Sequence, residues 1–108
     1  MGDFFAKGKK PINGYAEQKD TGWKTVNANV RYRKINGVVY VEATSDSSGA
    51  GWSVLGTLPA SVVPSKELIT SVYVDTNNSV MLRIYTNGNV ANVATASNIT
   101  NIISYPLG

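Results

Sequence analysis

Residues 33–41, RKINGVVYV, decide the fold because they predict a β-hairpin whose register is defined. Asn36-Gly37 is favoured in two-residue type I′ turns, and strand-forming residues flank it on both sides. With this turn, Ile35 faces Val38 and successive side chains alternate between two faces. The core row is expected to be Val30, Tyr32, Val39, Val41 and Ala43. The outer row is expected to be Arg31, Arg33, Tyr40 and Glu42, with Arg31 opposite Glu42 and Arg33 opposite Tyr40.

The rest of the chain continues this pattern of short strands and turns. Strands are expected over residues 23–34, 38–44, 52–58, 67–76, 80–86, 90–96 and 99–105. Turn signals recur about every eight to twelve residues, which is typical of all-β proteins. No stretch keeps a 3.6-residue apolar period over three turns, so we expect no α-helix longer than one turn. The predicted fold is all-β, a small antiparallel β-barrel or sandwich of about seven strands. Of these two forms we expect the closed barrel.

A second hairpin is expected around Asn77-Asn78. A three-residue loop over 77–79 would set Val74 opposite Leu82, which matches apolar with apolar positions, and a one-residue slip would turn every side chain over. This register also places Val72 opposite Ile84. The outer row is then Tyr73, Asp75, Met81, Arg83 and Tyr85, with Tyr73 opposite Arg83.

The next loop, residues 86–88, is expected to have three residues as well. Gly88 would take the left-handed conformation, which glycine adopts at little steric cost. This loop sets Ile84 opposite Val90 and extends the inner face into the following strand.

Composition indicates one globular domain. The 108 residues are 43% hydrophobic and 16% charged, with a formal net charge of +3. We expect a linker, neck or tail segment over residues 1–20 and a β head domain over 21–108. Lysines gather only in residues 7–10, so no nucleic-acid partner is expected. No apolar run approaches the roughly 20 residues of a membrane span, so no membrane partner is expected either.

The residue types also argue against an enzyme. The chain contains no histidine and no cysteine, which excludes Ser-His-Asp and Cys-His arrangements and the usual zinc sites. Its seven acidic residues do not cluster as paired carboxylates would. We therefore expect no catalytic activity and no cofactor.

Binding chemistry remains, and the second outer row has side chains suited to sugars. An aromatic ring can pack against the apolar face of a pyranose, while Asp, Asn and Arg bond its hydroxyls. The candidate ligand-binding residues are Asp46, Trp52, Tyr73, Asp75, Asn77, Asn78, Arg83 and Tyr85. The ligand is expected near the Asn77-Asn78 end of the row, with Trp52 and Asp46 contributing from the adjacent loop. Two alternatives stay open: these residues decorate a solvated sheet or meet another subunit, and Trp52 plugs the core or rim.

Five stretches are together similar to a known family. They are DTGWK (20–24), YRKINGVVYVEA (32–43), GWSVLGTLPASVVPS (51–65), RIYTNGNV (83–90) and SYPLG (104–108). Over residues 20–108 the chain resembles the C-terminal head domain of tail-fibre and baseplate receptor-binding proteins of phages of Gram-positive bacteria, lactococcal phages among them. The most specific piece is Trp52, then residues 55–59, then Pro64. The family's bend commonly reads LPAGYRP and here reads LPASVVP, so roles of the missing Gly, Tyr and Arg do not transfer.

The resemblance implies a small antiparallel β-barrel that forms a homotrimer about a fibre axis and binds host cell-wall saccharide. Contacts in the family vary with host, so it implies no fixed set of site residues. The expected function is that of a phage receptor-binding head, located at the tail tip or baseplate of the virion. Residues 1–20 would then join it to other tail or baseplate proteins. The alternative is a structural tail or baseplate module that binds no saccharide, and the outer row that meets a neighbouring subunit stays open.

Overall fold

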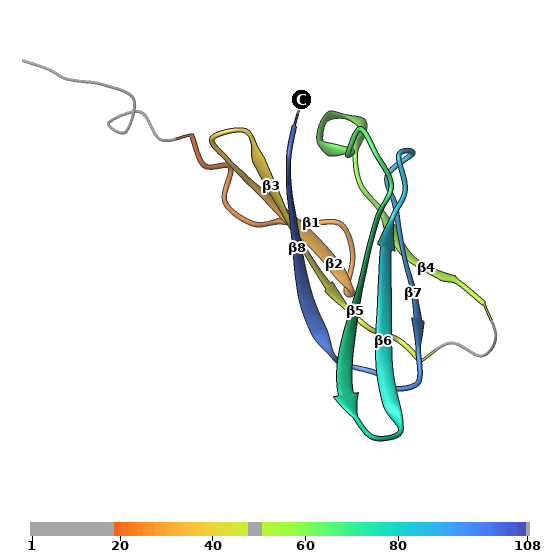
Figure 1. Cartoon of the computed structure of the whole chain (residues 1–108). Helices are drawn as coiled ribbons and strands as arrows, with labels where there is room; N and C mark the ends of the chain where they lie inside the picture. The colour runs from red at the N-terminus through yellow and green to blue at the C-terminus, as the bar shows by residue number, and fades with distance from the viewer. Residues whose placement is uncertain (1–18, 48–50, 108) are drawn as a thin grey trace, which may run out of the picture.

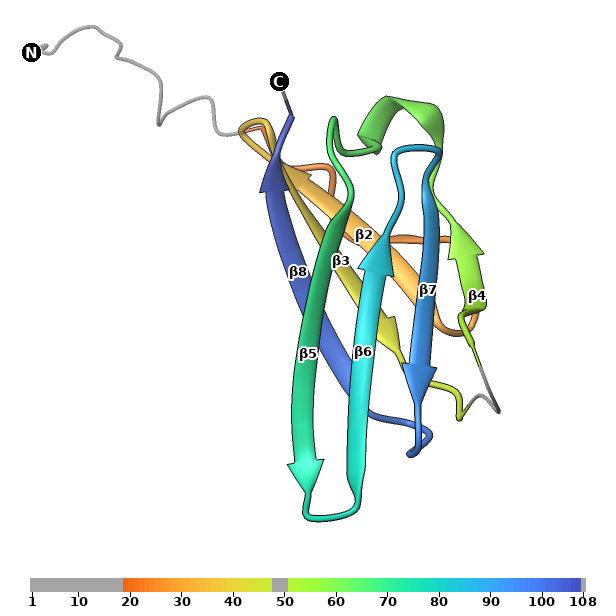
Figure 2. The ribbon, with the colours of Figure 1, turned by 45° about the vertical axis from the view of Figure 1, so that its right-hand side comes forward.

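The computed structural model describes residues 19–47 and 51–107, which form two four-stranded antiparallel sheets packed face to face (Figures 1 and 2). The strands are β1 (Lys24–Thr25), β2 (Val30–Ile35), β3 (Val38–Thr44), β4 (Ser53–Thr57), β5 (Leu68–Asp75), β6 (Asn78–Ile84), β7 (Asn89–Ala94) and β8 (Thr100–Pro106). The one helical element in the described residues is a 3-10 turn, η2 (Ala60–Val62). The all-β prediction is confirmed.

The two sheets form a sandwich, so the expected closed barrel is wrong. Sheet A has the strand order β1-β2-β3-β8, and sheet B has the order β4-β7-β6-β5. Within the described residues β8 is bonded only to β3 and β5 only to β6, so no ladder closes the gap between the sheets. The alternation of side chains is the same in a barrel and in a sandwich. The pattern in the sequence therefore could not separate the two.

The β2–β3 hairpin has the register expected from Asn36-Gly37. Ile35 pairs with Val38, and the cross-strand pairs on the outer face are Arg31 with Glu42 and Arg33 with Tyr40. Both turn residues have positive φ, +49° at Asn36 and +83° at Gly37, as a type I′ turn requires. Sheet A begins before β1, because Asp20 forms a bridge with Ile35. Of the predicted neck over residues 1–20, residues 1–18 lie outside the described part of the chain.

The β6–β7 loop is also confirmed. Ile84 pairs with Val90, and Gly88 has a φ of +96°. A Cβ at Gly88 would lie 2.7 Å from the carbonyl oxygen of Leu58. The loop therefore packs against the bend after β4, and Leu58 N–H donates to the Gly88 carbonyl at 2.9 Å.

The expected register of the β5–β6 hairpin is wrong. Val72 pairs with Val80 rather than with Ile84, and Asp75 pairs with Asn78, so the turn is a two-residue loop over 76–77 instead of the predicted three-residue loop over 77–79. A register shift between residues 73 and 75 leaves Val74 as an extra residue in β5. This bulge returns the ladder to matching faces. The predicted inner and outer rows therefore survive although the partners change.

The predicted strand over 23–34 is divided by a tight turn. β1 pairs with β2 through Thr25 opposite Arg31, and residues 26–29 connect them. The Oδ1 atom of Asn27 accepts hydrogen bonds from the backbone N–H groups of Asn29, at 2.8 Å, and Val30, at 3.0 Å. A side chain that bonds its own following backbone in this way favours a turn over a continuous strand.

The core lies between the sheets and draws on both. Its buried residues are Val30, Val39, Val41, Ala43, Leu58, Val62, Leu82, Ile84, Val90 and Tyr105. Tyr105 is polar but satisfied, because its hydroxyl donates to the carbonyl of Val62 in η2. Burial raises the pKa of the Tyr105 phenol to about 12. The inner faces are thus occupied by packing, which leaves the outer faces for binding.

Candidate functional site

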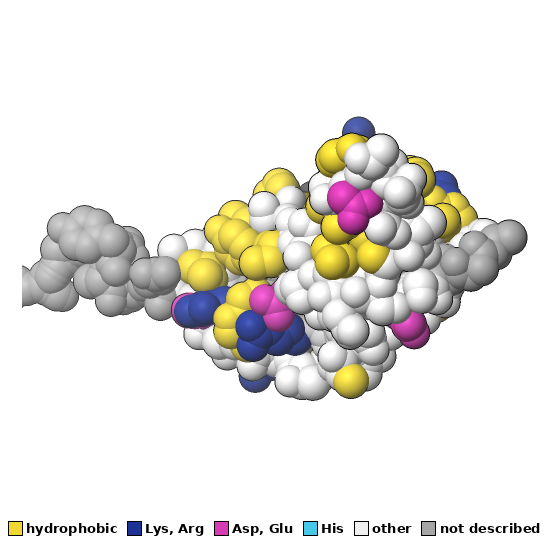
Figure 3. All heavy atoms as spheres, turned by 90° about the horizontal axis from the view of Figure 1, so that it is seen from below, with side chains coloured by type: hydrophobic (Ala, Val, Ile, Leu, Met, Phe, Trp, Pro, Cys, Tyr) yellow, Lys and Arg dark blue, Asp and Glu magenta, His cyan; other side chains and the backbone are white. Residues whose placement is uncertain are grey.

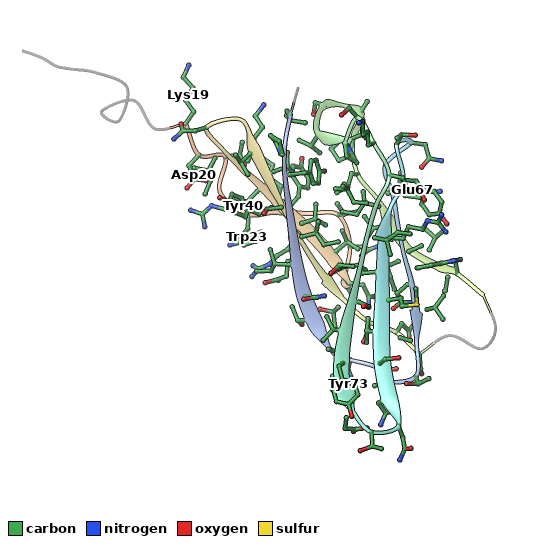
Figure 4. All side chains as sticks on the ribbon, viewed as in Figure 1. Lys19, Asp20, Trp23, Tyr40, Glu67 and Tyr73 are labelled. Carbon is green, nitrogen blue, oxygen red and sulfur yellow. The ribbon has the colours of Figure 1, made fainter. Side chains whose placement is uncertain are left out.

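The predicted site residues fall into three groups. Arg83 gathers with Trp52 and Tyr85 on the outer face of sheet B. Tyr73 faces Ser79 rather than Arg83, and Ser79 lies four positions from Arg83, or roughly 13 Å along the strand. Tyr73 therefore belongs to the opposite end of the face, as Figure 4 shows by its distance from Glu67 along the same sheet.

Arg83 is the centre of the first group. Its guanidinium carbon lies 5.1 Å from the centre of the Trp52 ring and 4.9 Å from that of Tyr85. Its Nε and Nη2 atoms both donate to Oε2 of Glu67, with a distance of 2.9 Å for Nε. These hydrogen bonds raise the pKa of Arg83 above its usual value. An exposed ion pair contributes little stability, so its main effect is to orient the guanidinium between the rings.

Glu67 was missed by sequence reasoning, which gave Arg83 no carboxylate partner. It precedes β5 by one residue, and β5 pairs with β6 so that Ile69 is opposite Arg83. The wrong register concealed this neighbour. Ala91, in the same cross-strand row, is fully buried although it lies on the outer face. The side chains around Arg83 therefore cover the sheet at this point.

The second group forms the β5–β6 turn. The Oδ1 atom of Asp75 accepts hydrogen bonds from the backbone N–H of Asn77, at 2.9 Å, and from Nδ2 of Asn78, at 3.0 Å. The Asn77 N–H, followed by the Asn78 amide, lowers the pKa of the Asp75 carboxyl. Tyr73, 75% exposed, stands beside this turn. The carboxylate thus holds the turn together, and the exposed ring is the group most open to a ligand.

Asp46 forms the third group, after the end of β3. Its backbone N–H donates to Oδ1 of the buried Asn92 at 3.0 Å. This contact anchors the start of the loop that leads to β4, in which residues 48–50 are not described. The structure therefore ties Asp46 to the inner face of β7 and separates it from the Arg83 group.

The outer face of sheet A carries a similar arrangement around Trp23. The guanidinium carbon of Arg31 lies 4.3 Å from the centre of the Trp23 ring, and that of Arg33 lies 5.8 Å from it. Arg31 donates from Nε and Nη2 to the two carboxylate oxygens of Glu42. Arg33 bonds Asp20 in the same bidentate manner, with 2.8 Å for Nε to Oδ1. The hydrogen bonds from Arg33 lower the pKa of Asp20 to about 2.

Sequence reasoning found the Arg31–Glu42 pair but missed Trp23 and Asp20 as part of this face. Both belong to DTGWK, the stretch that leads into β1. Because β1 pairs with β2, the position of this stretch could have indicated that its side chains lie on the same sheet as Arg31 and Arg33. Figure 4 shows Asp20, Trp23 and Tyr40 on the side of sheet A that faces away from sheet B. In Figure 3, basic and acidic side chains lie together at the lower left of the described part of the molecule. The arginines of this face are thus accompanied by carboxylates.

An open pocket of about 340 Å³ lies beside this cluster. It is lined by Thr25, Asn27, Ala28, Asn29, Val30, Arg31, Glu42 and Thr44. The β1–β2 turn forms one wall, and the outward side chains of β2 and β3 form the other. None of these residues was among the predicted ligand contacts.

Sheet B has a more apolar outer face. The exposed large apolar side chains there are Val54 (56%), Ile69 (54%), Tyr73 (75%) and Met81 (38%). Val54 and Ile69 flank Arg83 in one cross-strand row through Ala91. Several large apolar side chains exposed on one sheet face are a feature of interaction sites on soluble domains.

Comparisons with known proteins find no match, either among protein-family models or among curated protein sequences. The geometry of the two outer faces therefore carries the functional argument. The described part of the chain contains no group of three or more acidic residues placed to hold a metal ion. It also contains no helix long and apolar enough to cross a membrane.

Proposed function

We propose that residues 21–108 are the receptor-binding head of a phage tail-fibre or baseplate protein and attach the tail to saccharide of a Gram-positive cell wall. The observation that carries this proposal is the Arg83 group. It combines two aromatic rings with a guanidinium whose charge is matched by Glu67. Rings that bury C–H surface, together with directional donors, suit an uncharged polyhydroxyl ligand better than a strongly charged one.

The proposal also includes a homotrimer located at the tail tip, with residues 1–20 joining the head to other tail or baseplate proteins. One shallow polar site binds a single sugar weakly. Several copies on one particle raise the overall affinity through effective concentration, by a factor of roughly 10² to 10⁴. A trimer therefore supplies the overall affinity that a single head lacks.

Exchange of Arg83 for alanine tests the site. Binding of the full chain to purified cell walls from a panel of Gram-positive bacteria should weaken about ten-fold in Arg83→Ala, the loss typical of an interface residue of this kind. Arg33→Ala is the matched control, because it removes from sheet A an arginine that is also ion-paired and also lies near a tryptophan ring. Unchanged binding in Arg83→Ala, with loss in Arg33→Ala, would contradict the placement on sheet B.

A structural assembly module is the second candidate function, and the exposed apolar residues of sheet B favour it. If this face meets a neighbouring subunit, Ile69→Lys should convert a trimer into a monomer without unfolding it, because a lysine in a buried apolar contact loses its hydration. The control is Ser104→Lys, because Ser104 is exposed on β8, the edge strand of sheet A. Thr70→Lys is not a suitable control, because Thr70 faces inward. Sedimentation of the full chain as a monomer at tens of micromolar would contradict the trimer itself.

A further inference from the structure

The pocket beside Arg31 has the properties of a second ligand site, separate from the one expected on sheet B. Its volume of about 340 Å³ lies near the lower end of the range for small-molecule pockets. We propose that this pocket binds one uncharged pyranose unit of a saccharide. The ligand class rests on the proposed function, but the site lies on the opposite sheet and has its own residues.

The charges of the pocket favour an uncharged ligand. Its lining carries one positive and one negative side chain, Arg31 and Glu42, and the two are paired through both Nε and Nη2. A phosphate or carboxylate ligand would have to displace Glu42 or lie beside it. A divalent cation would find a single carboxylate that is already bonded. Neither class of ion is matched by these side chains.

The remaining polar atoms of the pocket suit hydroxyl groups. Within the described residues, Nη1 of Arg31, Oδ1 of Asn29 and Oγ1 of Thr25 have no hydrogen-bond partner, whereas Nδ2 of Asn29 donates to the Thr44 carbonyl at 3.0 Å. These free atoms comprise a donor, an acceptor and a group that does both. A sugar hydroxyl also donates and accepts, so the hydroxyls of a sugar match all three atoms in hydrogen-bonding type.

The walls of the pocket are fixed before any ligand arrives. The β1–β2 turn is held by Oδ1 of Asn27, and Nδ2 of Asn27 donates to the Leu55 carbonyl of sheet B at 2.7 Å. Arg31 is held on its other side by the Trp23 ring. Groups that are already ordered lose less entropy on binding. This preorganisation compensates in part for a pocket of modest size.

Amide chemical shifts of the ¹⁵N-labelled full chain can test the site residue by residue. The uncharged probes are methyl α-glucopyranoside, methyl α-galactopyranoside, N-acetylglucosamine and solubilised wall polysaccharide, and the charged probe is glycerol 3-phosphate. An uncharged probe should shift the amides of Thr25, Asn29 and Thr44, with an affinity that barely changes between low and high salt. Thr25→Val should weaken this binding about five-fold, the ratio that corresponds to one lost hydrogen bond of about 1 kcal/mol.

Two further variants separate binding from folding. Ala28→Phe should abolish the shifts, because Ala28 lines the pocket at an exposed turn where a larger side chain leaves the core untouched. Thr86→Val is the matched control for Thr25→Val, since Thr86 is equally exposed but lies in the β6–β7 loop. It should leave the affinity unchanged. Each variant must retain the amide spectrum of the folded chain.

The outcomes distinguish this inference from the proposed function. Shifts around Trp52 and Arg83 alone would overturn the pocket and leave the saccharide head in place. Shifts at the pocket with glycerol 3-phosphate only, lost at high salt, would show an anion site and also overturn the inference. If no uncharged probe, wall polysaccharide included, shifts any amide of the folded chain, both proposals fail. The two tryptophan indole signals, one on each sheet, report the two faces in the same spectrum.

Discussion

Replacement of Gly56 by alanine should both destabilise the sandwich and disturb the pocket. A Cβ at this position would lie 2.9 Å from Nδ2 of Asn27 and 3.2 Å from a methyl group of each of Val26 and Val30. The Asn27 side chain cannot move away without loss of its bond to the Leu55 carbonyl. Overpacking of this kind costs about 1–3 kcal/mol of unfolding free energy. We expect a loss of about 2 kcal/mol in urea unfolding followed by circular dichroism.

A double-mutant cycle with Asn27→Ala tests the cause. Asn27→Ala alone should cost about 1–2 kcal/mol, because hydrogen bonds to three backbone groups are lost at a partly exposed site. In that background Gly56→Ala should be nearly neutral, since the closest clash is gone and alanine is favoured over glycine in a strand by about 0.5–1 kcal/mol. The coupling would then be about 1–2 kcal/mol. If Gly56→Ala costs the same unfolding free energy in both backgrounds, the clash with Asn27 is not the cause of the destabilisation.

Two other predictions concern the fold. Gly88→Ala should destabilise the chain by about 1–3 kcal/mol more than Gly37→Ala. Both glycines have positive φ, but only at Gly88 would the new Cβ meet a backbone oxygen, at 2.7 Å. Equal losses of unfolding free energy in urea would contradict this packing. Burial raises the pKa of Tyr105 from 10.0 to about 12, so the unfolded state ionises first. Stability that is fully present below pH 10 should therefore fall as the pH rises to 12, by about 2–3 kcal/mol, and an identical alkaline decline in Tyr105→Phe would contradict this cause.

The fold could be read from the sequence wherever a turn depends on backbone preference alone. Asn36-Gly37 and Gly88 have the positive φ values that the sequence predicted, and the registers that follow from them are confirmed. The β5–β6 turn depends instead on a side chain. Asp75 bonds the following amides and closes a two-residue loop instead of the predicted three-residue one. Face matching alone could not detect this, because the bulge at Val74 preserves the faces.

The sequence predicted which types of residue form the site, but it did not predict their partners or their arrangement. The outer row identified Arg83 and Tyr85, and the structure places Trp52 beside them rather than near the β5–β6 turn. Their carboxylate partner, Glu67, follows from a register that the sequence did not specify. The pocket on sheet A was hidden for a related reason. It exists because Asn27 turns the chain after β1, whereas the predicted strand ran straight through this residue.

Adhesion to cell walls before and after periodate oxidation tests whether this chain is a saccharide-binding head, because periodate cleaves the vicinal diols of sugars. The labelled full chain is incubated with purified walls from a panel of Gram-positive bacteria, and binding is measured by sedimentation of the walls. We expect the folded chain to bind at least one of these walls. Periodate should abolish this binding, and protease treatment of the walls should leave it intact. Binding that survives periodate but is lost after protease treatment, or no binding to any wall by the folded and assembled chain, would contradict a saccharide-binding head.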